Sequence, residues 1–219
     1  MAYPSTLLNF CDTNGRFSSP VRLTFGGCKA DLECAYYPIP FDFDVKAALA
    51  ECRALEPLYC DHRPEDRAGG YEHRGWQSLT LHGIESRKTR DFVHYGFASL
   101  EDAGYHWTDV STQAPTLCNF LRTLPYERFH RVRIMRLAPG GYIMPHRDGA
   151  GRAFGPLNIA INNPVGCRFV FERGGVVPFQ PGSGMVLDVA RTHAVINEGQ
   201  EARYHVIVHG EYGRSIHYL

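Results

Sequence analysis

Apolar and polar residues alternate with a period of two through much of the chain between residues 131 and 209. Alternation of this kind predicts β-strands, whose successive side chains point to opposite faces of a sheet. We expect strands near residues 131–137, 141–146, 156–162, 167–172, 176–179, 185–189 and 203–209. Clusters of glycine, proline and asparagine separate them and indicate turns, the first at Pro139-Gly140-Gly141. Many short, regularly spaced strands favour a sandwich or barrel over a parallel α/β sheet.

Two segments earlier in the chain have the period of an amphipathic helix. In residues 44–56 apolar side chains form one stripe, Asp44 can cap the N-terminus and Pro57 ends the helix. Residues 112–124 repeat the pattern, and Pro125 follows directly. We expect both helices to pack on the outside of the β-structure.

The remaining pattern suggests how the chain is organised. Residues 61–75 are polar and are expected to form a loop, whereas residues 76–83 alternate like a strand. We find no internal repeat and no low-complexity linker. The chain is therefore expected to be a single domain, 1–219, in which residues 1–125 form an N-terminal elaboration and residues 126–219 form the β-core.

Composition excludes several classes of protein. Lys+Arg and Asp+Glu both number 23, so the net charge of +0 argues against general binding to a phosphate backbone. Apolar runs are too short for a membrane span, and the first residues lack a secretory pattern. The seven cysteines form no Cys-x-x-Cys pair, which favours reduced thiols in a cytoplasmic protein.

Two histidines and an aspartate form a candidate metal site. His146 and Asp148 are two residues apart, so on a strand they point to one face, and His193 follows another apolar run. Two imidazoles and one carboxylate form the facial triad of non-haem Fe(II) oxygenases, which leaves coordination positions open. His-x-Asp alone is a weak signal, because a surface histidine is the ordinary alternative for His146.

An arginine strengthens this interpretation. Arg203 opens the last apolar strand, ten residues beyond His193. If Arg203 faces the inside of a barrel, its planar guanidinium requires a carboxylate partner, which it can bind bidentately. Taken alone, Arg203 would be an exposed arginine on an edge strand.

These residues lie in a stretch that resembles the Fe(II)- and 2-oxoglutarate-dependent aspartyl/asparaginyl β-hydroxylase family. The resemblance runs from Arg131 to Gly210, with Gly75-Trp-Gln-Ser-Leu upstream. The matching segments are Ala138-Pro-Gly-Gly-Tyr-Ile-Met-Pro-His-Arg-Asp, Leu157-Asn-Ile-Ala-Ile, Gly166-Cys-Arg-Phe, Gly182-Ser-Gly-Met-Val-Leu-Asp, His193-Ala-Val-Ile-Asn and Arg203-Tyr-His-Val-Ile-Val.

The resemblance implies a fold, an activity and a site. The fold is mainly β with flanking helices, around a double-stranded β-helix core of the jelly-roll, cupin-like type. The activity is hydroxylation of an unactivated C–H bond of an amino acid, free or within a peptide or protein, using O2 and releasing succinate and CO2. His146, Asp148 and His193 would bind Fe(II), and Arg203 would bind the distal carboxylate of 2-oxoglutarate.

Further residues join the candidate site on weaker grounds. His205 shares a strand face with Arg203, and the resemblance places Asn158 where the family often has a histidine that touches 2-oxoglutarate. Candidate substrate-binding residues, each with an ordinary structural alternative, are Arg152 and Phe154 in the loop after Asp148, Arg133 on the first core strand and Trp76.

Two other functions remain open. A non-enzymatic cupin-like metal-binding or sensing module would bind metal without turning over 2-oxoglutarate, but it has no need of Arg203. A nucleic-acid-directed oxygenase of the same superfamily is disfavoured by the balanced charge. The expected partner is a small amino acid or peptide. The sequence leaves its identity, the stereochemistry and the oligomeric state open.

Overall fold

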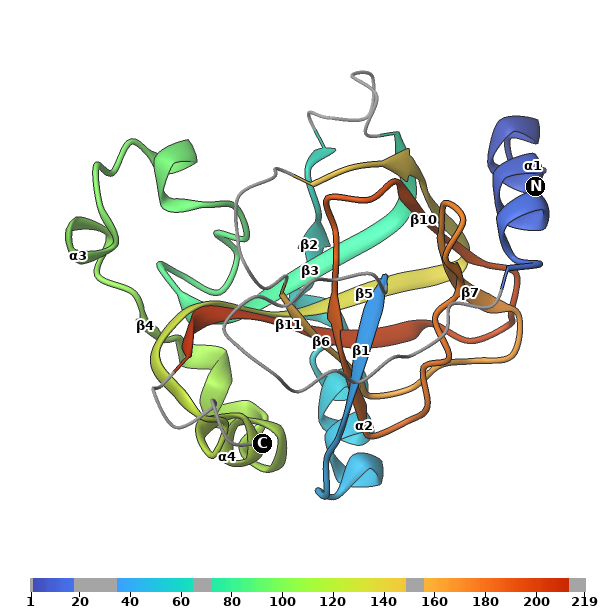
Figure 1. Cartoon of the computed structure of the whole chain (residues 1–219). Coiled ribbons are helices and arrows are strands. Elements are labelled where there is room, and N and C mark those ends of the chain that lie inside the picture. Colours follow the sequence, from blue (N-terminus) through green and yellow to red (C-terminus); the bar gives the residue numbers. More distant parts are fainter. Residues whose placement is uncertain (1, 18–34, 65–71, 149–155, 213–219) are drawn as a thin grey trace, which may run out of the picture.

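A 21-residue strand, β5 (Tyr126–His146), joins the two halves of the sheet. Its first part pairs with β11 on one edge and its second part pairs with β10, while β3 follows the other edge along much of its length (Figure 1). The computed structural model describes residues 2–17, 35–64, 72–148 and 156–212. The strand thus passes from one half of a folded sheet into the other.

The described elements follow the chain in this order. The helices are α1 (Ser5–Asn14), α2 (Val45–Ala54), α3 (Leu100–Ala103) and α4 (Pro115–Arg122), and 3-10 turns span Glu56–Leu58, Phe92–Tyr95 and Asp109–Gln113. The strands besides β5 are β1 (Tyr36–Pro40), β2 (Cys60–Asp61), β3 (His73–Gly83), β4 (His106–Trp107), β6 (Leu157–Ala160), β7 (Cys167–Phe171), β8 (Gly175–Val176), β9 (Ser183–Leu187), β10 (His193–Asn197) and β11 (Arg203–Tyr212).

The sheet order is β1-β9-β6-β11-β5-β10-β7-β8, with antiparallel pairing throughout. One half is β1-β9-β6-β11 with the first part of β5, and the other is the second part of β5 with β10, β7 and β8. Buried side chains from both halves form one cluster between them, including Met135, Ala160, Met185, Phe169 and Val195. This arrangement is the expected jelly-roll, and we call the space between its halves the lumen.

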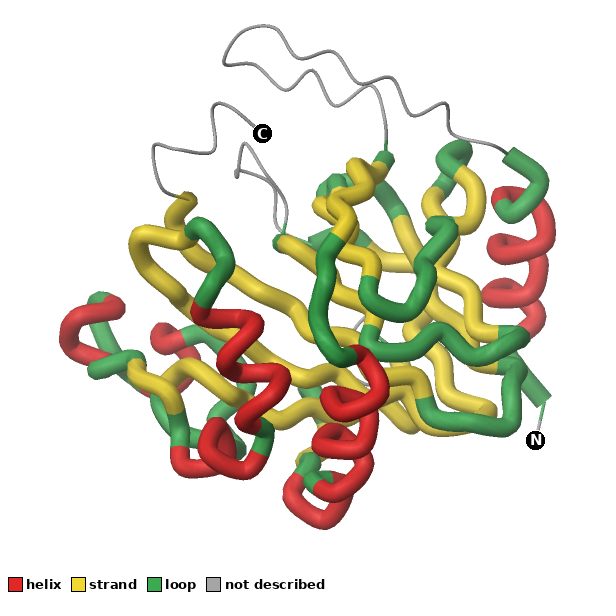
Figure 2. The backbone as a smooth tube through the Cα atoms, turned by 90° about the horizontal axis from the view of Figure 1, so that it is seen from below, coloured by secondary structure: helices red, strands yellow, loops and turns green. Residues whose placement is uncertain are grey.

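Pleating directs the remaining apolar residues to the outer faces. Val132 and Ile134 of β5, with Val206 of β11, pack against α2 and α4, whose buried residues include Cys52 and Leu117. The two predicted helices therefore cover the outside of the sheet, as expected (Figure 2). No helix in the described ranges is long and apolar enough to cross a membrane.

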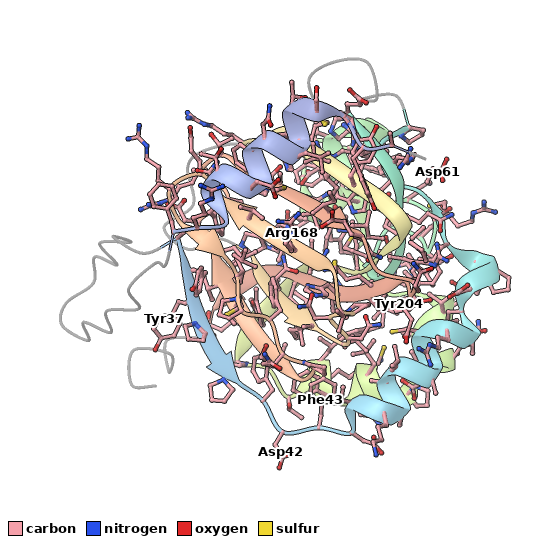
Figure 3. The ribbon with its side chains drawn as sticks, turned by 90° about the vertical axis from the view of Figure 1, so that its right-hand side faces the viewer. Tyr37, Asp42, Phe43, Asp61, Arg168 and Tyr204 are labelled. Atoms are coloured by element: carbon pink, nitrogen blue, oxygen red, sulfur yellow. The ribbon has the colours of Figure 1, made fainter. Side chains whose placement is uncertain are left out.

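The second half of the sheet is covered by a helix that the sequence pattern did not indicate. Leu7 and Cys11 of α1 pack against Val170 of β7 and Ala194 of β10. Arg168 of β7, labelled in Figure 3, also pairs with Asp12 of α1 at 3.2 Å. The helix is short and has a mixed pattern, so its apolar side becomes apparent only against the sheet.

Several predicted boundaries were wrong. Pro139-Gly140-Gly141 does not break the strand, because β5 continues through it. The strand expected at 176–179 is reduced to β8, and β1 and β10 were not predicted. The predicted loop at 61–75 is partly strand, since β2 and β3 enter it from either end; residues 65–71 lie outside the described part.

Two glycines explain why β5 bends without ending. Gly140 has φ +71°, a left-handed conformation that glycine adopts without strain. A Cβ at Gly141 would lie 2.7 Å from the Ala138 carbonyl oxygen, so the backbone there is too crowded for a side chain. The glycines permit a bend, and pairing with β3 on one edge keeps the strand continuous.

Asn197 holds this bend from the end of β10. Its buried amide nitrogen lies within hydrogen-bond distance of the carbonyl oxygens of Leu137, Ala138 and Glu201, at 3.1, 3.2 and 2.9 Å. We expect Asn197→Ala to lower the free energy of unfolding by about 2–4 kcal/mol, because it leaves buried carbonyl groups without a donor.

Urea denaturation of Asn197→Ala beside Asn163→Ala tests this. Asn163 is half-buried and makes one 3.3 Å bond to the Phe179 carbonyl, so its loss should cost about 1 kcal/mol or less. Equal losses in the two variants would show that Asn197 has no special part in holding the bend.

The described cysteines agree with the expectation of reduced thiols. None of them forms a disulfide, and all but Cys60 are buried. The described cysteines are Cys11, Cys52, Cys60, Cys118 and Cys167. Burial raises the pKa of Cys11 to about 11, which keeps its thiol protonated near neutral pH. Cys28 and Cys34 lie outside the described residues.

Candidate functional site

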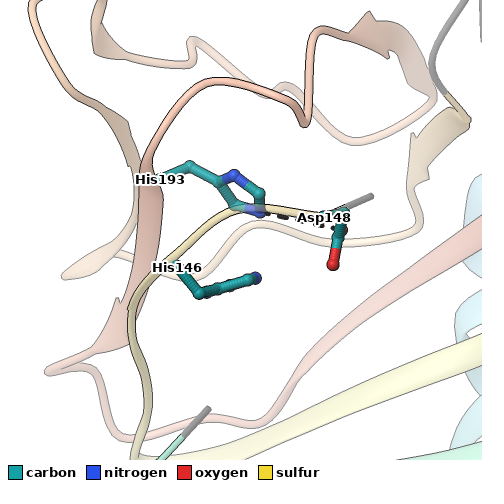
Figure 4. A group of neighbouring side chains, drawn as sticks. All are labelled: His146, Asp148 and His193. Atoms are coloured by element: carbon teal, nitrogen blue, oxygen red, sulfur yellow. Dashed lines mark ion pairs between the residues drawn. The ribbon is translucent and has the colours of Figure 1, made fainter. Parts of the chain in front are cut away.

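Strand pairing brings the three predicted metal ligands together. His146 ends β5 and is directly opposite His193, the first residue of β10. Asp148 follows β5 by two residues, and its backbone N–H donates to the Val189 carbonyl at 2.9 Å. One ligand atom from each of the three side chains lies within 4.8 Å of the others (Figure 4). His193 follows β9, as the sequence pattern predicted, and begins the further strand β10.

Backbone hydrogen bonds fix which nitrogen of each histidine faces the cluster. The Nδ1 of His146 lies 2.7 Å from the Met144 carbonyl oxygen, and the Nδ1 of His193 lies 2.9 Å from that of Arg191. A carbonyl oxygen only accepts, so both Nδ1 atoms carry the proton. Each Nε2 therefore keeps the lone pair that a metal ligand needs.

The surroundings keep both rings neutral. Burial, and secondly the neighbouring His193, lower the pKa of His146, and burial lowers the pKa of His193. Phe169 stacks on the His193 ring with centroids 5.1 Å apart and planes 7° from parallel. The ligand set is thus oriented and deprotonated at Nε2 before any metal binds.

Asp148 supplies the anionic oxygen of the cluster. Its side chain is 36 % exposed, and Oδ2 lies 4.0 Å from His193 Nε2 (Figure 4). Arg147, between His146 and Asp148 in the chain, points away: its Nε donates to Thr192 Oγ1 at 2.9 Å, and 68 % of the side chain is exposed. Two imidazoles and one carboxylate suit Fe(II) and leave further coordination positions for other ligands.

A buried cation lies deeper in the lumen. Arg203 is 5 % exposed and its guanidinium donates to His205 Nδ1 at 2.7 Å. No carboxylate in the described part of the chain forms an ion pair with it, and its buried Nε–H has no acceptor there. Burial lowers the pKa of Arg203, which reflects the cost of a charge in this position.

Two aromatic rings connect this cation to the metal cluster. Phe169, stacked on His193, is 6.2 Å from Phe179 between ring centroids. The ring centroids of Phe179 and His205 are 4.4 Å apart. The Phe179 centroid also lies 5.8 Å from the Arg203 guanidinium carbon. Two aromatic side chains therefore lie between the His–Asp–His cluster and the Arg203 guanidinium.

The other strand residues predicted for the site lie on the strand faces that the period-two alternation predicts. Asn158 of β6 is buried, and its Oδ1 lies 3.2 Å from His205 Nδ1. Arg133 of β5 is buried and donates to the Thr89 carbonyl oxygen at 2.9 Å, with His209 Nε2 at 3.3 Å.

Trp76 joins the buried cluster of the lumen and contacts the rings of His62 and His73. The predicted loop residues Arg152 and Phe154 lie outside the described part of the chain.

Sequence reasoning missed three residues that shape the site. Phe169, Phe179 and His62 were not among the residues predicted for the site. His62 is 2 % exposed and accompanies Ser78 and Trp76 on the lumen side of β3. Alternation along β7 was a usable signal for Phe169. Phe179 lies outside any strand, so no periodicity pointed to it.

Solved structures resemble this chain only distantly. A Pseudomonas putida prolyl-4-hydroxylase is 15 % identical, with 84 % of this chain and 96 % of that chain covered and a TM-score of 0.45. A Burkholderia pseudomallei oxidoreductase of the 2OG-Fe(II) oxygenase family is 16 % identical, with 90 % and 98 % covered and a TM-score of 0.49. A Trichoplax adhaerens prolyl hydroxylase is 12 % identical, with 97 % and 89 % covered and a TM-score of 0.47. These likenesses are too distant to bear on the assignment.

The match to a family model assigns this chain to a family. No match was found among curated proteins. The model of the aspartyl/asparaginyl β-hydroxylase matches residues 44–211, a range that contains His146, Asp148, His193 and Arg203. Because the match spans most of the chain, the protein belongs to the aspartyl/asparaginyl β-hydroxylase family of Fe(II)- and 2-oxoglutarate-dependent oxygenases.

Proposed function

We propose that this protein hydroxylates an unactivated C–H bond of an amino acid, either free or within a peptide. In this proposal His146, Asp148 and His193 bind Fe(II), and Arg203 binds the distal carboxylate of 2-oxoglutarate. When bound, the iron and the keto acid supply the oxidising chemistry with O2, and succinate and CO2 are released.

The observation that carries the proposal is the buried Arg203. A guanidinium in a low-dielectric lumen is costly unless an anion compensates its charge, and the described residues contribute none. A dicarboxylate with a short apolar spacer is the kind of ligand that this order of groups favours. One end would chelate the metal, the methylenes would lie along Phe169 and Phe179, and the far carboxylate would reach Arg203.

The protein's own groups do the positioning. The Met144 and Arg191 carbonyls hold the histidines with Nε2 toward the metal, so that binding displaces no proton. The guanidinium fixes the keto acid in one orientation through its planar fork. The phenylalanines and Trp76 limit the access of water, which restricts side oxidation.

Substrate choice is proposed to reside at the mouth of the lumen. Arg152 and Phe154 follow the proposed ligand Asp148 closely in the sequence. Trp76 and Arg133 are candidates for the opposite wall. Loops and rim residues can vary without disturbing the iron and keto-acid sites, which are built on strands.

A non-enzymatic metal-binding module is the alternative from another class. It accounts for the His–Asp–His cluster equally well, but it gives a buried Arg203 no purpose. The experiment that separates them is succinate formation with Fe(II), 2-oxoglutarate and O2 across a panel of free amino acids and short peptides. We expect one group of substrates to raise succinate above the uncoupled rate and to gain one oxygen atom by mass. Metal binding with no succinate under any condition would favour the module.

A further inference from the structure

Arginine side chains from separate segments gather around the buried His62 ring on the lumen side of β3. Arg63 directly follows His62, Arg90 lies in the segment after β3, and Arg131 and Arg133 occupy alternate positions of β5. Burial lowers the pKa of His62, and the charges of three of these arginines lower it further. Burial and the charge of Arg63 likewise lower the pKa of Arg90. We call these four residues, Arg63, Arg90, Arg131 and Arg133, the arginine rim.

Arg63 connects the arginine rim to the metal cluster. Its carbonyl oxygen lies 3.0 Å from His73 Nε2, and His73 is directly opposite Ile143 on β5, the strand that His146 ends. Burial is the main cause of the lowered pKa of His146, and the positive charge of Arg63 contributes to it. The rim therefore adjoins the cluster, on the side of the lumen formed by β3 and β5.

Uncharged acceptors hold two of the rim's guanidinium groups. Arg133 is 6 % exposed; one of its terminal nitrogens donates to the Thr89 carbonyl oxygen at 2.9 Å, and the other lies 3.3 Å from His209 Nε2. Arg90 lies 3.1 Å from His94 Nε2 in the same way. Because a guanidinium only donates, each of these imidazole nitrogens accepts and its ring is neutral. The contacts orient both guanidinium groups without neutralising their charge.

Acidic residues are scarce in the segments that carry or face the arginine rim. Arg131 pairs with Asp91 at 3.3 Å. Asp91 is the single acidic residue of these segments, which are residues 62–63, 73–80, 88–95, 129–135 and 205–209. Guanidinium groups brought together repel one another, and an anion bound among them relieves that repulsion. The rim is therefore a concentration of positive charge next to the metal cluster, suited to an anionic ligand.

We propose that the substrate presents a phosphate monoester to the arginine rim, so that the enzyme hydroxylates a phosphorylated amino acid, free or within a peptide. The inference rests on the proposed function. One planar guanidinium is enough to match a carboxylate, whereas a phosphate monoester carries about two negative charges at pH 7 and three terminal oxygens. Arg133 is the main expected contact because it is buried and held in place, and Arg63 and Arg90 add further donors from other segments.

The test compares three amino acids that differ in the charge of the side chain. O-phosphoserine is doubly charged, aspartate singly charged and asparagine uncharged. Binding is measured by calorimetry on protein loaded with Ni(II) and saturated with 2-oxoglutarate, so that Arg203 is already occupied. We expect O-phosphoserine to bind at least about tenfold more tightly than aspartate, and asparagine to bind most weakly.

Variants assign this binding to the rim. Arg133→Met should weaken O-phosphoserine binding about ten- to a hundredfold and change asparagine binding by less than about threefold. Arg136→Met is the matched control, since Arg136 lies on the opposite face of β5 and bonds Gln77. It should leave both affinities within about twofold of the wild type. Arg63→Met, at a half-buried position, should weaken O-phosphoserine binding about fivefold.

The outcomes separate this inference from the proposed function. Aspartate or asparagine binding as tightly as O-phosphoserine, or no measurable binding of O-phosphoserine, overturns the inference; so do equal losses in Arg133→Met and Arg136→Met. Should Arg133→Met fail to fold, an unchanged affinity in Arg63→Met overturns it instead. Succinate formation decides the function independently: turnover with unphosphorylated substrates alone leaves the function standing without the inference. Tight O-phosphoserine binding with no succinate from any substrate would leave the anion site standing and overturn the function.

Discussion

The His193→Ala variant is expected to lose high-affinity Fe(II) binding and with it all 2-oxoglutarate turnover. Loss of an outer partner of a metal ligand commonly costs ten- to a hundredfold in affinity, so loss of a ligand should weaken binding by more than about a hundredfold. His193 is 3 % exposed and directly opposite His146, so its loss removes one of the two imidazoles of the cluster. Metal titration by calorimetry and succinate release measure the two effects.

Arg147→Ala is the matched control for this variant. Arg147 lies between the two ligands His146 and Asp148 but points to Thr192 and solvent, so metal affinity should stay within about threefold of the wild type. Full metal affinity and turnover in His193→Ala would remove the triad from the account. Equal losses in both variants would indicate that the segment, rather than the ligand, had been disturbed.

Replacing Arg203 by methionine should separate co-substrate binding from stability. Losing a buried, charge-assisted bidentate pair is expected to cost about 2–5 kcal/mol, seen as a rise in the Michaelis constant for 2-oxoglutarate of about thirtyfold or more. The free energy of unfolding of the ligand-free protein should change by no more than about 1 kcal/mol. Removal of an uncompensated buried charge offsets the lost hydrogen bond to His205.

Two further variants sharpen this experiment. Arg203→Lys should not restore 2-oxoglutarate binding, because an ammonium group cannot reproduce the planar fork. Arg136→Met, on the opposite face of β5, should have the reverse pattern: Arg136 bonds Gln77 and pairs with Glu56, so its loss should lower stability and leave the Michaelis constant unchanged. An unchanged Michaelis constant in Arg203→Met would mean that the carboxylate binds elsewhere.

The alternation of apolar and polar residues predicted correctly which side chains face the lumen. Alternation along the last strand placed Arg203 and His205 on one face, and the structure has both buried beside Asn158. The spacing of His146 and Asp148 predicted a shared site, and their atoms and those of His193 do converge. These predictions succeed because strand geometry is local and the side-chain direction follows from residue number alone.

Features set by tertiary contacts could not be predicted in this way. The Pro139-Gly140-Gly141 sequence has the composition of a turn, yet pairing with β3 keeps β5 continuous while its other partner changes from β11 to β10. Phe179 reaches the Arg203 guanidinium from a segment without regular structure. No local pattern encodes either result, because each depends on segments far apart in the chain.

The most direct test of the central claim is the visible charge-transfer absorption that arises when 2-oxoglutarate chelates protein-bound Fe(II), measured without oxygen. The account predicts that the band appears in the wild type and is absent from His193→Ala. In Arg203→Met it should require a much higher 2-oxoglutarate concentration, by about thirtyfold or more. A wild-type protein that binds Fe(II) without developing the band, or a band that persists in His193→Ala, would contradict the proposed site.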